Sequence, residues 1–129
     1  VVSAWNLHKK ALACEELEHF VVFSSINGLL GSRGGLGHAS TNCSLDSLIH
    51  MRVALGLPGV AIQLGPVMDV GSAARFGMAT ANALFDPVSV GLFRKSLEIS
   101  LQMKQAASPL AIIPFNSNFG KRARASGIS

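Results

Sequence analysis

The residues best suited to chemistry lie in one stretch of the chain, FVVFSSINGLLGSRGGLGHASTN at positions 20–42. Two hydroxyls, Ser24 and Ser25, follow the apolar run FVVF, and His38 and Asn42 come after a series of glycines. His38 and Asn42 are four residues apart, so on a helix their side chains share one face. Hydroxyl and carboxamide groups hydrogen-bond to polar ligands, and an imidazole can also exchange a proton near neutral pH.

Three predicted elements would position these side chains. The run Phe20–Phe23 is β-branched and aromatic, which is typical of a parallel strand buried on both faces. The glycines of residues 28–37 predict a loop at which the backbone approaches another group closely. A helix is expected from about His38 to Leu55. In an open α/β sheet, ligands bind outside the carboxyl ends of the strands, so we expect the site at the end of the first strand.

A second strand should follow this helix. Gly56-Leu57-Pro58-Gly59 ends the helix, and Val60–Leu64 is again an apolar run. A helix between two such strands predicts a βαβ unit with parallel strands and a right-handed crossover. Asp46 is expected in solvent. The inward stripe of the helix is expected to be Leu45, Leu48, Ile49 and Arg52.

The rest of the chain predicts further helices and a third strand. Residues 3–18 and 87–105 have helical spacing, and Asp86 is the expected N-cap of the second helix. Residues 67–85 are rich in small residues and methionine and predict a mobile loop over the site, and residues 110–113 predict a strand. The fold class is therefore α/β, a doubly wound parallel sheet of which about three strands are present. The expected inward residues are Trp5, Leu7 or His8, Leu12 and Leu17 in the first helix, and Val90, Phe93, Leu97 and Leu101 in the second.

Size and composition suit one α/β unit. The chain has 129 residues, 49% of them hydrophobic, and a net charge of +4 that comes largely from its last residues. We interpret that end as a solvated tail and expect no nucleic-acid partner. No apolar run approaches about 18 residues and no secretory signal is present, so we expect no membrane partner and a cytoplasmic location. We expect Cys14 and Cys43 to be reduced, and the spacing of the two cysteines does not suggest a metal site.

The combined motifs resemble a known family. FVVFSSINGLLGSRGGLGHASTNCSLDSL is similar to the active-site segment of the β-ketoacyl reductase domains of type I fatty acid synthases and polyketide synthases, within the short-chain dehydrogenase/reductase superfamily. GLPGVAIQLGPVMDVG, DPVSVGLFRKSLEIS and PLAIIPFNSNF resemble later segments of the same domains. The resemblance implies a Rossmann-like fold. It assigns residues 1–120 to the C-terminal portion of a ketoreductase domain and leaves 121–129 as a basic flexible tail.

The resemblance also implies roles for the candidate residues. Ser25 matches the serine that hydrogen-bonds the substrate carbonyl, and Asn42 matches the asparagine that orders a water in the proton relay. His38 stands where the family has its catalytic tyrosine, thirteen residues after Ser25, and the chain contains no tyrosine. Histidine can act as a general acid, but its donor atom is shorter in reach by roughly 2 Å. Taken from the residues alone, Ser25 could simply cap a loop and Asn42 could bond back to its own helix.

A cofactor and partners follow from the same resemblance. Gly65, Pro66 and Val67 match the turn that holds the nicotinamide carboxamide, and Ser24 lies beside the cofactor ribose in that scheme. The implied cofactor is NADP(H), and because the dinucleotide-binding half is not in the sequence, we expect no binding by residues 1–129 alone. The expected partners are the acyl carrier protein-bound β-ketoacyl substrate, the neighbouring synthase domains and the N-terminal half of the domain.

Two main functions remain open at this point, and a plain nucleotide-binding module is a third, weaker hypothesis. One is NADPH-dependent reduction of a β-ketoacyl thioester to the β-hydroxyacyl form. The other is a catalytically degenerate reductase-like scaffold, which His38 in place of tyrosine favours. The chain starts without Met, so we expect it to be a piece of a larger protein whose exposed strand edge promotes a homodimer. His8, His19 and His50 are expected to have no special partners.

Overall fold

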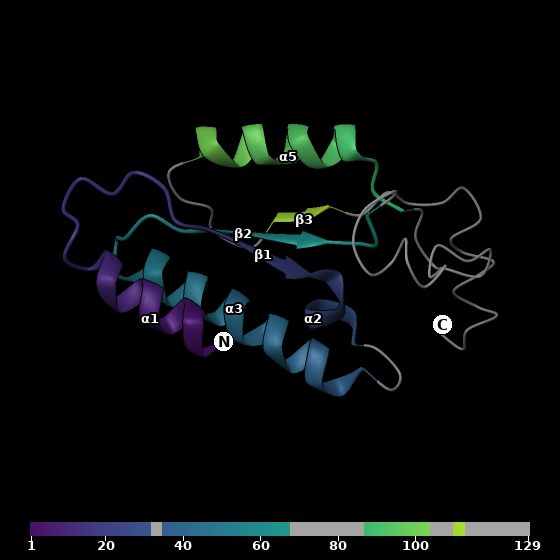
Figure 1. The fold of residues 1–129 in the computed structure, drawn as a ribbon, viewed down its shortest axis with the longest axis horizontal. Helices are drawn as coiled ribbons and strands as arrows, with labels where there is room; N and C mark the ends of the chain where they lie inside the picture. Colours follow the sequence, from purple (N-terminus) through teal and green to yellow (C-terminus); the bar gives the residue numbers. More distant parts are fainter. Residues whose placement is uncertain (32–34, 68–86, 104–109, 113–129) are drawn as a thin grey trace.

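The fold is a parallel sheet with helices on both faces (Figure 1). The computed structural model describes residues 1–31, 35–67, 87–103 and 110–112. Most of the loop expected over the site, at 67–85, lies outside these ranges, as do Asp86 and the tail at 121–129. The elements in chain order are α1 (Val2–Ala11), β1 (Val21–Ser25), α2 (Ile26–Leu30), α3 (Leu36–Ala54), β2 (Val60–Leu64), α5 (Val90–Gln102) and β3 (Leu110–Ile112).

The three strands lie in the order β1-β2-β3, and both pairs are parallel. Val21 pairs with Val60 and Ser25 with Leu64, so β1 and β2 end at the same edge of the sheet. The α/β class and the parallel βαβ unit are therefore confirmed. Each strand lies where an apolar run predicted it, although β1 begins one residue after Phe20 and continues through Ser25.

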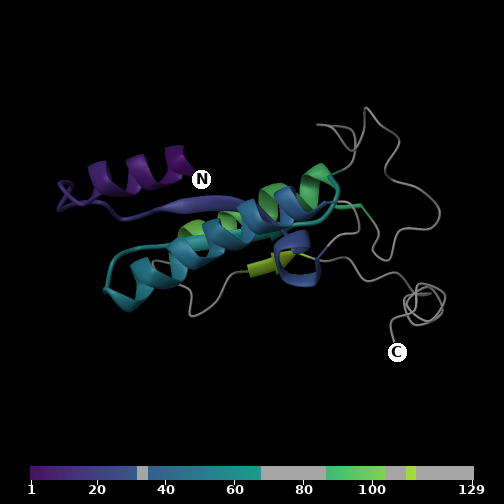
Figure 2. The same cartoon turned by 90° about the horizontal axis from the view of Figure 1, so that it is seen from below.

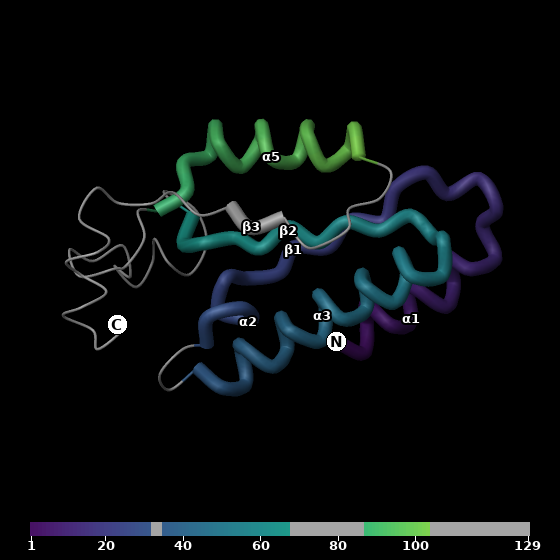
Figure 3. The backbone as a smooth tube through the Cα atoms, turned by 180° about the vertical axis from the view of Figure 1, so that it is seen from behind, coloured from purple at the N-terminus to yellow at the C-terminus, as the bar shows by residue number. Residues whose placement is uncertain are grey.

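Alternate residues of β2 build two separate cores. Ala61 packs with Phe20, Leu48 and Ile49 on the face covered by α1 and α3. Val60 and Ile62 pack on the opposite face, where Leu97 of α5 covers them. Figure 3 shows the same three layers from behind, with α5 and α3 on opposite sides of the strands.

The two helical connections have opposite hands. Each connection moves one strand further across the sheet in the same direction, from β1 to β2 and from β2 to β3. The helices of the two connections, α3 and α5, lie on opposite faces of the sheet. Figures 1 and 2 show that β1–α3–β2 turns right-handed, as predicted. The connection from β2 through α5 to β3 is therefore left-handed, which is rare for parallel strands.

The inner face of α1 agrees only in part with the prediction: of the alternatives Leu7 and His8 it is His8 that is buried, and Leu17 packs against the core. The helix ends at Ala11, and Trp5, Leu7 and Leu12 are all exposed, at 37%, 60% and 54%. His8 is the buried residue of α1, and Ala4 and Ala11 on either side of it pack against the core with α3. Spacings of four and three residues place these three on one helical face. The core-facing side of α1 is therefore built from small side chains and one buried imidazole, rather than from the larger apolar stripe.

The inner face of α5 also differs. Ser89, rather than Asp86, is the N-cap, and its Oγ accepts a hydrogen bond from Leu92 N at 3.1 Å. The predicted inward residues Val90 and Leu101 are exposed, whereas Ser96 and Ser100 are buried. Both serine hydroxyls donate to backbone carbonyls of their own helix, so their polar atoms are satisfied without a partner across the core.

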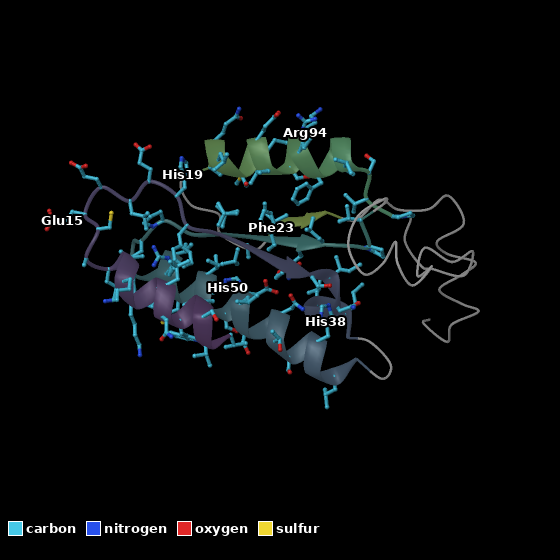
Figure 4. The ribbon with its side chains drawn as sticks, viewed as in Figure 1. Glu15, His19, Phe23, His38, His50 and Arg94 are labelled. Carbon is cyan, nitrogen blue, oxygen red and sulfur yellow. The ribbon has the colours of Figure 1, made fainter. Side chains whose placement is uncertain are left out.

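Phe23 was predicted to be buried within a strand covered on both faces, but it is 47% exposed. Its ring lies 5.4 Å from that of Phe93 on α5, centroid to centroid (Figure 4). β1 pairs only with β2 among the described strands, so its outer edge and part of the Phe23 ring lack a covering strand.

Within the described ranges, no helix has the length and apolar character needed to cross a bilayer.

Candidate functional site

The candidate site lies where β1 and β2 end. Ser25, the last residue of β1, pairs with Leu64, the last residue of β2, and Gly65 follows immediately. The parallel register therefore brings the turn at Gly65–Val67 beside Ser25. This is the edge at which open α/β sheets bind ligands.

Ser25 connects the strand to a short helix. Its backbone is extended, and its Oγ accepts a hydrogen bond from Asn27 N at 3.2 Å, which caps α2. A serine hydroxyl has one donor and two acceptor positions, so this cap leaves the Ser25 O–H able to donate to a ligand. The cap thus orients the hydroxyl without using its proton. The predicted glycine loop is partly helical here, because α2 occupies residues 26–30.

Gly28 brings α2 against α3. A Cβ atom at this position would lie 3.1 Å from Cys43 N and 3.3 Å from Asn42 Cβ. Any side chain would push the two helices apart, so glycine permits the close backbone approach that the glycine-rich pattern predicted. The helix that Ser25 caps is therefore in direct contact with the helix turn that carries Asn42.

His38 and Asn42 touch each other on α3. Asn42 Nδ2 donates to His38 O at 2.8 Å and lies 3.3 Å from Nε2 and 3.4 Å from Nδ1 of the His38 ring. The bond to a carbonyl shows that the amide nitrogen, rather than the oxygen, faces His38. Asn42 is 7% exposed, whereas His38 is exposed near the meeting point of α2 and α3 (Figure 4). The ring is thus held beside Asn42 while remaining open to solvent.

The turn after β2 is also fixed. Val88 N donates to Pro66 O at 2.6 Å, and Val67 forms a parallel bridge with Val88. Val88 is fully buried, so this contact anchors the turn to the segment that leads into α5. Gly65, Pro66 and Val67 are half-buried beside the end of β1.

Ser24 points away from this turn. It alternates with Ser25 along β1, and its neighbour Val22 packs in the core beneath α1 and α3. Ser24 is 6% exposed, and its Oγ has no hydrogen-bond partner among the described residues. The structure therefore places Ser25 beside the Gly65–Val67 turn, and places Asn42 and His38 on the helix that α2 packs against. Ser24 lies on the α3 side of the sheet.

The expectation that Asp46 is solvated is wrong. Asp46 is 7% exposed, and its Oδ2 accepts a hydrogen bond from Gln63 Nε2 at 2.7 Å. The sequence contained the signal, because Asp46 follows Asn42 and His38 at four and eight residues and so shares their helical face. Gln63 is likewise the polar residue of the apolar strand VAIQL. A polar line thus runs along α3 from the site into the protein.

His8 was expected to lack a partner, and this is also wrong. It is 5% exposed, and its Nδ1 lies 2.8 Å from Nη1 of Arg52. Arg52 was correctly predicted to face inward and is 1% exposed. Burial lowers the pKa of the Arg52 guanidinium, because desolvation disfavours its charged form. This cluster lies at the end of α3 opposite His38 and stabilises the scaffold rather than the site.

Comparison with known proteins identifies the family. The family model of the KR domain matches residues 1–69, which is more than half of the chain. The chain belongs to the KR domain family. The matched part contains β1, α2, α3 and β2, and therefore every residue of the candidate site.

The curated relatives of this KR chain are polyketide synthases and related synthases. It is 43% identical over 82 residues to the highly reducing polyketide synthase 40 of Fusarium mangiferae, which covers 64% of this chain and 3% of the relative. It is 38% identical over 108 residues to the naringenin synthase of Pestalotiopsis fici, covering 78% of this chain and 4% of the relative. The KR chain thus spans a small fraction of the length of these proteins.

Solved structures agree with the fold. An A-type ketoreductase from a modular polyketide synthase matches with a TM-score of 0.76 and 27% identity, over 88% of this chain and 24% of that one. The first ketoreductase of the tylosin polyketide synthase shares the fold, with a TM-score of 0.72 at 22% identity, over 95% of this chain and 27% of that one. The resemblance to β-ketoacyl reductase domains and the partial Rossmann-like fold are both confirmed.

Proposed function

We propose that this KR chain is part of an NADPH-dependent reductase domain of a polyketide synthase. The domain would reduce the β-keto group of an acyl thioester on an acyl carrier protein to a β-hydroxy group. Family membership supports this class of reaction, and the geometry of the site supports the roles of its residues. The observation that carries the proposal is the contact of Asn42 with the exposed His38 ring, next to the helix capped by Ser25.

Each side chain has a role that fits its contacts. The Ser25 O–H donates to the substrate carbonyl oxygen, because its acceptor side is already engaged by Asn27 N. His38 donates a proton to the same oxygen as a general acid. Asn42 positions the ring, since its amide is fixed by the bond to His38 O. Bound NADPH would supply the hydride, and the anchored Gly65–Val67 turn is the part of this chain suited to hold its carboxamide.

The test uses the full-length synthase, a β-ketoacyl thioester and NADPH, with NADPH oxidation followed by absorbance. We expect turnover, and we expect His38→Phe to abolish it because phenylalanine has no proton to give. His38→Tyr should retain or raise the rate, because a phenol restores the longer reach, and an error of about 1 Å can cost about a hundredfold. His50→Phe is the matched control: this exposed histidine lies on α3 far from the site and should leave the rate unchanged.

The second candidate is a catalytically degenerate scaffold that keeps neighbouring synthase domains in place. The observation that favours it is the exposed histidine where the family carries tyrosine. Under this hypothesis the full-length protein still binds NADPH but does not turn over, and His38→Phe changes nothing. Turnover that depends on His38 would exclude the scaffold.

The proposal extends to domain limits and assembly. We assign residues 1–120 to the C-terminal portion of a ketoreductase domain and 121–129 to a basic tail. Residues 1–129 alone should not bind NADPH, and a micromolar affinity measured for them by calorimetry would contradict this. The outer edge of β1 pairs with no described strand, so this chain alone should also dimerise through that edge.

A further inference from the structure

Two unpaired polar atoms lie beneath the candidate site. Ser24 Oγ and Asp46 Oδ1 are buried, and neither has a hydrogen-bond partner among the described residues. The two residues are 6% and 7% exposed. Native proteins pair nearly all such atoms with protein groups or with ordered water, so two orphans in one region indicate a missing partner.

The two residues belong to one cluster. Ser24 and Gln63 are register partners on adjacent strands, whose backbones lie about 4.8 Å apart. Their neighbours Val22 and Ala61 both pack in the core under α1 and α3. The strand alternation therefore turns Ser24 and Gln63 toward α3 as well. Gln63 Nε2 donates to Asp46 Oδ2 at 2.7 Å, which brings the carboxylate of α3 down to the strand pair.

The chemistry of the two atoms defines the partner. Each carboxyl oxygen of an aspartate can accept hydrogen bonds, and Gln63 donates to Oδ2. Asp46 Oδ1 therefore needs a donor, whereas the Ser24 hydroxyl can donate or accept. A water molecule can bond to both atoms at once, and buried waters characteristically join two to four otherwise unpaired groups. A lone carboxylate offers too few ligands for a metal ion.

We propose that Ser24 Oγ and Asp46 Oδ1 hold one buried water molecule between β1 and α3. The water ties β1 to α3, in the way that Gln63 ties β2 to α3. Asn42 and His38 lie one and two helical turns before Asp46, so both ties set the position of the candidate site. The proposal rests on burial and register and does not require the reduction reaction, so the two can fail separately.

The direct test is a high-resolution crystal structure of the full-length chain. We expect density for a water about 2.5–3.0 Å from both Ser24 Oγ and Asp46 Oδ1. A direct bond between these two atoms would overturn the proposal. So would a protein side chain donating to Asp46 Oδ1, or the absence of density between the two atoms.

A double-mutant cycle tests the coupling in solution. Ser24→Ala should reduce the folding equilibrium constant roughly fivefold, because the water and Asp46 lose a partner. In the Asp46→Leu background the same change should cost almost nothing, since the carboxylate has gone. Ser47→Ala is the control: it also deletes a hydroxyl from α3, and that exposed hydroxyl donates to Cys43 O of its own helix, at 2.9 Å. Its effect should be the same in both backgrounds.

Equal costs of Ser24→Ala in both backgrounds would overturn the water bridge. If Asp46→Leu does not fold, the crystal structure of Ser24→Ala decides the question. The water should then be lost or weakened. Unchanged density at full occupancy would show that Ser24 does not hold it.

Discussion

Replacing Arg52 with alanine should remove a large part of the stability of the KR fold. The side chain is 1% exposed, and its Nε donates to Pro58 O at 2.9 Å. Its Nη1 lies 2.8 Å from His8 Nδ1, and its guanidinium carbon lies 3.9 Å from the centroid of the Phe20 ring. One cation thus connects α1, the entrance to β1 and the turn before β2.

The expected loss can be worked from these contacts. Leaving a buried acceptor unsatisfied costs about 1–3 kcal/mol, and alanine leaves both Pro58 O and His8 Nδ1 without their donor. The contact with Phe20 adds about 0.5–2 kcal/mol. Because the bond to Pro58 O is only part-buried, we expect a value in the lower part of the combined range. The free energy of unfolding should fall by about 3–5 kcal/mol, against a total of about 5–15 kcal/mol for a typical domain. Arg52→Met should cost less, because it keeps the volume and removes the buried charge.

The measurement is urea denaturation of the full-length chain, with hydrogen exchange to localise the loss. Amides of α1 and α3 should lose protection together. A double-mutant cycle of His8→Phe with Arg52→Met should give a coupling energy of about 1–2 kcal/mol, whereas exposed His50→Phe should be additive with Arg52→Met. A loss below about 1 kcal/mol for Arg52→Ala, or equal coupling at His8 and His50, would refute the reasoning.

The buried Arg52 should not make stability depend on pH near neutrality. Burial lowers its pKa, so the folded state binds this proton less tightly than the unfolded state does. The resulting penalty is fully present below the folded pKa and is relieved only as the pH rises through it. Arginine stays protonated over the accessible range, so Arg52→Met should shift the unfolding free energy equally at about pH 8 and pH 9, above the range in which histidines ordinarily change charge. A difference between these two pH values would contradict this.

Three further substitutions test the local geometry. Gly28→Val should separate α2 from α3 and destabilise the fold by about 1–3 kcal/mol in denaturant melts, and an unchanged midpoint would show that the helices can move apart freely. Asn42→Asp removes the donor to His38 O and should cost about 1–3 kcal/mol, and no loss would show that this bond contributes little. Ser89→Ala should cost about 1 kcal/mol through loss of the cap of α5, with Ser89→Asp restoring it; equal stability of the two variants would argue against the cap.

The sequence alone predicted the elements that depend on short-range pattern. The apolar runs located β1, β2 and β3, and the spacing of four residues correctly put His38 and Asn42 side by side. Arg52 was correctly placed inward, because its position falls on the same helical stripe as Leu48 and Ile49. Periodicity and spacing are local properties, so one chain segment is enough to determine them.

Only the tertiary structure decided which polar residues are buried and with what. Asp46 and His8 have ordinary surface chemistry, and each is buried because a residue distant in sequence, Gln63 or Arg52, meets it across the core. The register of β1 on β2 likewise decided that Ser25 lies beside Leu64 and the Gly65 turn, and that Ser24 lies beside Gln63. Such contacts depend on how separate elements pack, because a buried polar group is tolerated only where a partner arrives to satisfy it.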